Sequence, residues 1–127
     1  MSERGSQVSR YLADLEMVHS AFKDLSGPEK STQRLHEINI LAKRLEMKLA
    51  AAKLAQAEYC FDLLNARRDF LENRCAQGRA TSYERDALDW AYETLPLNKS
   101  TVEELAAELD NHKRELELLI EVALQAA

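Results

Sequence analysis

The sequence predicts an all-α protein: an elongated helical bundle, or antiparallel coiled coil, of about four helices around one long central helix at about residues 30–76. Two observations predict this class. Only three glycines and two prolines occur in 127 residues, whereas sheets and loop-rich folds need many turn residues. Residues that favour helices dominate the chain, and its apolar residues recur three and four positions apart. This length suits a single domain over residues 1–127.

The first predicted helix spans roughly residues 6–25. Ser6 can cap its N-terminus, and Gly27 followed by Pro28 suits its end, because proline cannot continue a helix. Spacings of three and four then place one row of apolar residues on a single helix face. This row consists of Val8, Tyr11, Leu15, Val18, Phe22 and Leu25.

The second predicted helix begins near Pro28 or Glu29 and contains no breaker before Gly78. At about 45 residues it would be roughly 65–70 Å long. It carries two apolar stripes on separate faces. The first seam runs through Leu35, Ile38, Ala42, Leu45, Leu49, Ala52, Gln56, Tyr59, Leu63, Ala66 and Phe70. The second stripe consists of Ile40, Met47, Leu54 and Phe61, broadened by Ala50, Ala57, Leu64 and Leu71.

A helix that is apolar on two faces must be packed between neighbours. The rest of a 127-residue chain cannot easily cover both faces of so long a helix, so a protein partner or a homodimer is expected. Gln56, the only polar residue of the first seam, either fixes the packing register or marks where the neighbouring helix ends. The predicted partner interface consists of Leu35, Ile38, Ile40, Leu45, Met47, Leu49, Leu54 and Phe61.

Two further helices are predicted, at roughly residues 81–95 and 100–126. Thr81 and Glu84 have the spacing of a capping box, and Pro96 is expected to end the third helix. Ser100 or Thr101 can cap the fourth. The apolar seam of the fourth helix consists of Val102, Leu105, Leu109, His112, Leu116, Leu119, Ala123 and Ala126.

The net charge of −5 is unevenly distributed along the chain. Residues 1–99 hold 15 basic and 15 acidic residues, whereas residues 100–127 hold seven acids and two bases. Nucleic-acid binding needs a basic surface, so nucleic acid is not an expected partner. A basic protein partner could bind the acidic segment. An acidic inhibitor or immunity-type protein that acts through helix 100–126 is therefore an alternative function.

Several features predict a cytoplasmic protein. No run of 18 apolar residues is present, so no membrane span is expected, and the polar N-terminus does not resemble a secretory signal. Cys60 and Cys75 fall on one predicted helix about 22 Å apart, too far for a disulfide within the chain. Free thiols are typical of a reducing compartment.

Two patterns point to a further alternative, a helical metal-binding or phosphotransfer protein. Glu16 and His19 have the Glu-x-x-His spacing of ferritin-like metal sites, and Glu108 with His112 could add a second pair. The segment from His19 to Lys23 resembles the His and Lys pair of histidine phosphotransfer domains. That resemblance implies a phospho-accepting histidine in a helical bundle, but Asp24 stands where the family has Gly.

No complete chemical motif is present. The chain has no glycine-rich phosphate loop and no nucleophile elbow, and neither cysteine has a ligand-spaced partner. No catalytic, cofactor or metal site is therefore predicted. The leading prediction is a non-enzymatic interaction module, such as a small helical adaptor, chaperone or assembly subunit, that acts through exposed apolar helix faces.

Overall fold

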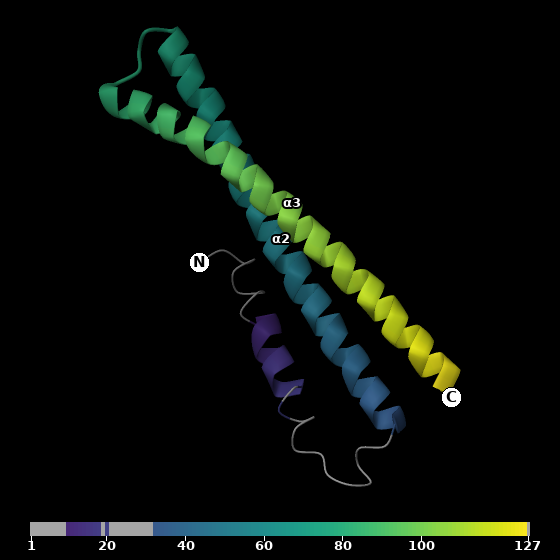
Figure 1. Cartoon of the computed structure of the whole chain (residues 1–127). Coiled ribbons are helices and arrows are strands. Elements are labelled where there is room, and N and C mark those ends of the chain that lie inside the picture. The colour runs from purple at the N-terminus through teal and green to yellow at the C-terminus, as the bar shows by residue number, and fades with distance from the viewer. Residues whose placement is uncertain (1–9, 19, 21–31, 127) are drawn as a thin grey trace. The chain divides into compact units, whose positions relative to one another are not determined.

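The computed structural model describes residues 10–18, residue 20 and residues 32–126 (Figure 1). Each of these residues outside the turn at 77–81 is helical, so the described part of the chain contains no strand. It comprises a helical segment over residues 10–18 and 20, helix α2 from Thr32 to Ala76 and helix α3 from Ser82 to Ala126. The predicted all-α class is confirmed.

The chain divides into two compact units, described separately below. Unit 1 consists of Met1–Leu54 and Leu105–Ala127, and unit 2 consists of Ala55–Glu104. Among the described residues of unit 1, Leu15, Leu49, Ala50 and Ala52 are buried. The single domain over residues 1–127 stays a prediction.

The long helix of the prediction is confirmed as α2, whose 45 residues run without interruption. Residues 30 and 31 of the predicted helix lie outside the described residues. In the predicted first helix, residues 10–18 and residue 20 are helical, and the other residues of 6–25 lie outside the described part. No helix of the described part is long and apolar enough to cross a membrane.

A glycine ends α2 in the way that its sequence position suggests. Gly78 has φ +69°, a left-handed conformation that glycine adopts without the steric cost of a Cβ atom. Its N–H donates to the carbonyl of Cys75, and the N–H of Arg79 donates to the carbonyl of Arg74. These two bonds form a Schellman motif, which satisfies carbonyls at the C-terminus of the helix.

The predicted capping box at the start of α3 is confirmed. Thr81 Oγ1 accepts a hydrogen bond from the Glu84 N–H at 3.1 Å, and Glu84 Oε1 accepts one from the Thr81 N–H at 3.1 Å. Arg74, in the last turn of α2, donates to both carboxylate oxygens of Glu84. Glu84 therefore joins the two helix ends across the turn.

The prediction of two separate helices after the turn is wrong. α3 continues through Pro96 to Ala126, so the structure has three helical segments rather than four among its described residues. Proline cannot donate to the carbonyl four residues earlier, but Pro96 and Tyr92 are both exposed, so water can satisfy that carbonyl. The preceding residue, Leu95, is buried in the core of unit 2. Burial of Leu95 directly before Pro96 favours continuation of the helix through the proline.

Unit 2 is an antiparallel helical hairpin with its own apolar core. Leu64 of α2 packs with Ala91 and Leu95 of α3, and Phe61 packs against this cluster. Leu71 is 1% exposed, the lowest value for a large side chain among the described residues. The core thus uses one face of each helix, and this leaves the remaining faces to solvent.

Candidate functional site

The predicted partner interface on α2 is largely covered. Leu49 is buried, and the other seven residues of that prediction are half-buried. Seven of the eight belong to unit 1, and Phe61 belongs to unit 2. A role for them in partner binding stays a prediction.

The first seam of α2 changes from covered to exposed along its length. Its residues up to Ala52 are half-buried or buried, whereas from Gln56 onward they are exposed. In unit 2, Leu63 is 53% exposed and Phe70 is 57% exposed. Gln56 therefore marks the point at which cover along this seam ends, which is one of the two roles expected for it.

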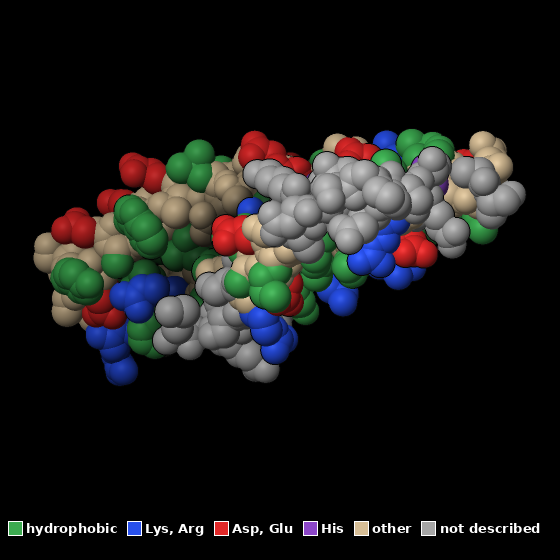
Figure 2. Space-filling view, turned by 90° about the horizontal axis from the view of Figure 1, so that it is seen from below, with side chains coloured by type: hydrophobic (Ala, Val, Ile, Leu, Met, Phe, Trp, Pro, Cys, Tyr) green, Lys and Arg blue, Asp and Glu red, His purple; other side chains and the backbone are tan. Residues whose placement is uncertain are grey.

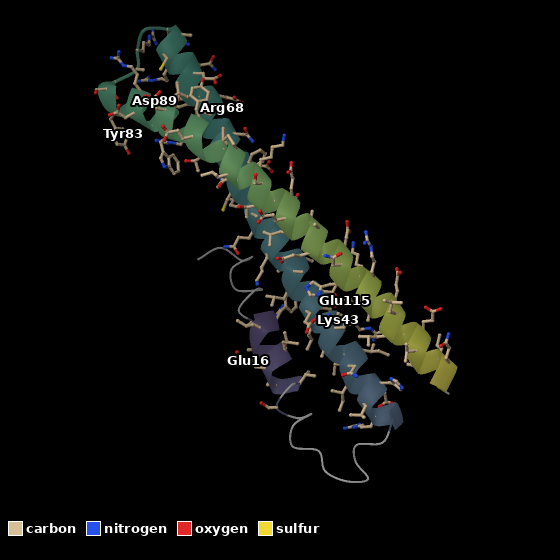
Figure 3. All side chains as sticks on the ribbon, in the orientation of Figure 1. Glu16, Lys43, Arg68, Tyr83, Asp89 and Glu115 are labelled. Atoms are coloured by element: carbon tan, nitrogen blue, oxygen red, sulfur yellow. The ribbon has the colours of Figure 1, made fainter. Side chains whose placement is uncertain are left out.

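A second exposed apolar row lies on α3 in unit 2. Tyr83, Trp90 and Leu97 are seven residues apart, so they occupy one helix face, and they are 75%, 58% and 68% exposed. Ala87 and Thr94 lie between them with heptad spacing and are half-buried. Tyr83, the first residue of this row, is labelled in Figure 3.

These two rows lie on the same side of the hairpin. Leu63, Phe70 and Trp90 each directly precede a buried residue of their own helix, and successive residues turn by about 100° around a helix. Antiparallel helices turn in opposite senses when viewed from one end. The positions just before the buried residues therefore share one side, and Tyr83 and Leu97 join it because they lie seven residues from Trp90. We call this side the apolar face: Leu63, Phe70, Tyr83, Trp90 and Leu97.

A cross-helix contact supports this assignment. By the same geometry, the positions just after the buried residues share the opposite side of the hairpin. Tyr92 directly follows Ala91 and Glu72 directly follows Leu71, and the Tyr92 hydroxyl donates a hydrogen bond to the Glu72 carboxylate. This bond raises the pKa of Tyr92 above its ordinary value. Figure 2 shows hydrophobic side chains at the surface among acidic and basic ones.

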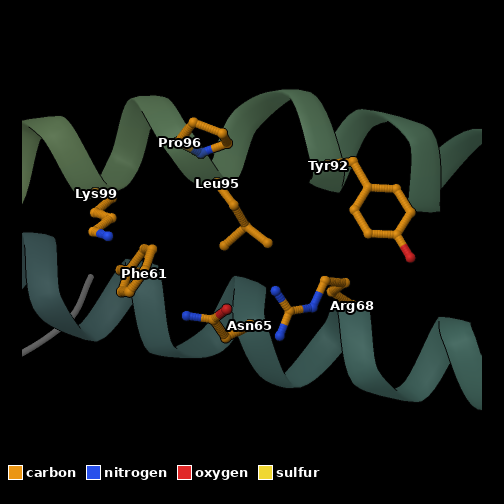
Figure 4. Close-up of a pocket in the computed structure, with 7 residues that line it drawn as sticks. All are labelled: Phe61, Asn65, Arg68, Tyr92, Leu95, Pro96 and Lys99. Atoms are coloured by element: carbon orange, nitrogen blue, oxygen red, sulfur yellow. The ribbon is translucent and has the colours of Figure 1, made fainter.

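The side opposite the apolar face holds an open groove of about 440 Å³ (Figure 4). Arg68 is already paired with Asp69 at 3.0 Å and lies 3.8 Å from Glu72. The groove therefore presents a largely neutralised guanidinium and an exposed Lys99 beside apolar walls. Its lining consists of Phe61, Asn65, Arg68, Tyr92, Leu95, Pro96 and Lys99.

A cluster of charged side chains lies in unit 1, where Lys43 of α2 reaches Glu115 of α3 (Figure 3). Lys43 also bonds Glu46 at 2.6 Å and lies 3.5 Å from His112 Nδ1. Burial disfavours the charged form of Lys43, but the hydrogen bonds and charges of Glu115 and Glu46 outweigh it and raise the pKa of Lys43. The bond from Lys43 lowers the pKa of Glu115.

The residues considered for metal binding or phosphotransfer do not form a site in the described part of the chain. Glu16 is exposed, and His19 lies outside the described residues. His112 faces Lys43 and Glu46, and an ammonium group beside its ring nitrogen opposes cation binding there. Among the described residues, no group of three or more His, Cys, Asp or Glu side chains could hold a metal ion.

Both cysteines lie on α2, as predicted, and both are free thiols. Cys60 is exposed and Cys75 is half-buried. Neither cysteine belongs to the apolar face.

Comparisons with known proteins found no match to this chain among family models, curated proteins or solved structures.

Sequence reasoning missed the exposed row on α3. The sequence pattern places all the apolar residues of the predicted helix at 81–95 on one side: Tyr83, Ala87, Leu88, Trp90, Ala91 and Leu95. Two apolar rows one position apart run along this helix, and the row of Leu88, Ala91 and Leu95 is the buried one. The heptad spacing of Tyr83, Trp90 and Leu97 was a signal that could have separated the two.

Proposed function

We propose that this chain is a non-enzymatic interaction module that acts by packing an apolar helix face against another protein. The observation that carries the proposal is the apolar face of unit 2. Its five large side chains are each more than half exposed, and the three on α3 follow heptad spacing. Contiguous exposed apolar surface of this kind marks protein interaction sites, and heptad spacing fits a helical partner.

The test is site-specific photo-crosslinking in the native host. A photoreactive residue at Leu97 should attach the chain to another polypeptide, because Leu97 lies on the apolar face. The matched position is Lys99, which is also exposed on α3 but lines the groove on the opposite side. The adduct at position 97 should disappear when Trp90→Glu is introduced. An absence of any protein adduct at position 97 would contradict the proposal.

A second candidate function follows from the acidic part of α3. All seven acidic side chains of residues 100–127 are exposed, although Glu115 pairs with Lys43. An inhibitor or immunity-type protein could use them to bind a basic partner. Such binding should weaken steeply between 50 and 500 mM salt, because exposed charges are screened over about 10 Å at 0.1 M. Binding that is independent of salt would contradict this candidate.

A further inference from the structure

The apolar face is large enough to form most of a stable protein interface. Its five side chains are between 53% and 75% exposed. At roughly 200 Å² for each side chain, the exposed area is on the order of 600 Å². A standard interface buries about 800 Å² on each partner. The face therefore needs only a modest rim of further contacts.

The charges around the face differ between its two helices. On α3, Asp86 and Glu93 lie four residues before and three residues after Trp90, so both border it on the helix surface. On α2, Arg67 lies between Leu63 and Phe70, four residues after one and three before the other. All three charged side chains are exposed. The α3 row is thus apolar with an acidic border, and the α2 row is apolar with a basic centre.

The heights of these residues along the hairpin are fixed by its internal contacts. Leu64 packs with Ala91 and Leu95, and Arg74 pairs with Glu84. These contacts place Leu63 at the height of Thr94 and Phe70 at the height of Ala87. They place Arg67 at the height of Trp90.

We propose that a second copy of this chain covers the apolar face, with α3 of each copy lying against α2 of the other, an inference that rests on the proposed function. A two-fold axis parallel to the helices keeps the heights given above. Leu63 of one copy then packs against Thr94 of the other, and Phe70 packs against Ala87. Leu63 and Phe70 are thus each opposed by a smaller side chain, as in the knobs-into-holes packing of coiled coils.

The same arrangement pairs the charges. Arg67 of one copy lies over the Trp90 ring of the other, where a guanidinium is attracted to the aromatic face. Asp86 and Glu93 stand on either side of that position and can pair with it. Because the interface is isologous, each of these contacts occurs twice.

The experiment is sedimentation equilibrium of the purified 127-residue chain and three variants. The wild-type chain should be a dimer at micromolar concentration, and Arg67→Glu should weaken dimerisation at least tenfold, since it sets like charges against each other. Combining Arg67→Glu with Glu93→Arg should restore the dimer. Lys99→Glu makes the same charge change on the opposite side of the hairpin and should leave the dimer intact. Circular dichroism checks that each variant remains helical.

Three results would overturn the second-copy proposal. These are a monomeric wild-type chain at 100 μM, an Arg67→Glu variant that dimerises as well as the wild type, and a Lys99→Glu variant that is impaired equally. Crosslinking at Leu97 separates this failure from failure of the proposed function. An adduct of two copies of this chain supports both proposals. An adduct with a different protein supports the proposed function and overturns only the proposal that a second copy covers the face.

Discussion

At the residue scale, the structure separates side chains that hold the fold from side chains that are available for contact. Leu71 and Phe70 are neighbours in the chain, yet one is 1% exposed and the other is 57% exposed. The difference arises because a helix turns by about 100° at each residue, so adjacent residues occupy different faces. A substitution at Leu71 should therefore change the stability of the fold, whereas a substitution at Phe70 should change the surface available for contact.

Replacing Leu71 with alanine should lower the free energy of unfolding by about 2–5 kcal/mol. The change removes buried methyl groups and leaves a cavity in the core of unit 2. Urea denaturation followed by circular dichroism measures the loss. Leu118→Ala removes the same atoms from an exposed position and should cost well under 1 kcal/mol. Equal losses in the two variants would contradict the assigned core.

Glu84 should contribute to the free energy of unfolding by an amount that depends on pH. The bonds from Arg74 and from the Thr81 N–H lower the pKa of Glu84 in the folded chain, below the value of about 4.3 expected when unfolded. The folded state then binds fewer protons, so the stabilisation is present above the unfolded pKa and is lost as the pH falls through the folded pKa.

The measurement compares wild-type and Glu84→Gln chains by urea denaturation between pH 7 and pH 2.5. The variant should be less stable at pH 7, and the difference should shrink as the solution is acidified below about pH 4. Glu103→Gln, at an exposed position of the same helix outside the apolar face, provides the control. A wild-type advantage that persists unchanged at pH 2.5 would count against the role given to Glu84.

At the element scale, α3 shows how packing overrides a local helix breaker. Ser100 and Thr101, four and five residues after Pro96, are good capping residues, so the local sequence predicts two helices. The apolar spacing nevertheless keeps its phase across the proline, because Leu95 and Val102 are seven residues apart. That continuity was the signal for a single helix.

Replacing Pro96 with alanine should therefore stabilise the chain. Proline costs about 3 kcal/mol relative to alanine inside a helix, and the new N–H can donate to the carbonyl of Tyr92. The free energy of unfolding should rise by up to that amount. Ser100→Ala, at an exposed position one turn later, should add only about 0.5 kcal/mol. A neutral or destabilising effect of Pro96→Ala would indicate that α3 is not continuous there.

At the scale of the whole molecule, the sequence was sufficient for some features and insufficient for others. The all-α class, the long helix and the cap at Thr81 all depend on local patterns that a single chain displays directly. The cover over the first seam of α2 depends on where other elements lie, and the sequence does not state this. The predicted interface accordingly lies between Leu35 and Phe61, whereas the first seam is exposed farther along, at Leu63 and Phe70.

A chain that pairs through its apolar face should melt at a temperature that depends on its concentration. Association stabilises only the folded chain, so mass action couples dimer formation to unfolding. A hundredfold rise in concentration should raise the melting temperature of the wild-type chain by about 5 °C. Trp90→Ala removes a large side chain that is already 58% exposed in the single chain. The variant should therefore keep its helices but melt at nearly the same temperature at all concentrations. A wild-type melting temperature that does not change with concentration would show that folding and self-association are not linked in this molecule.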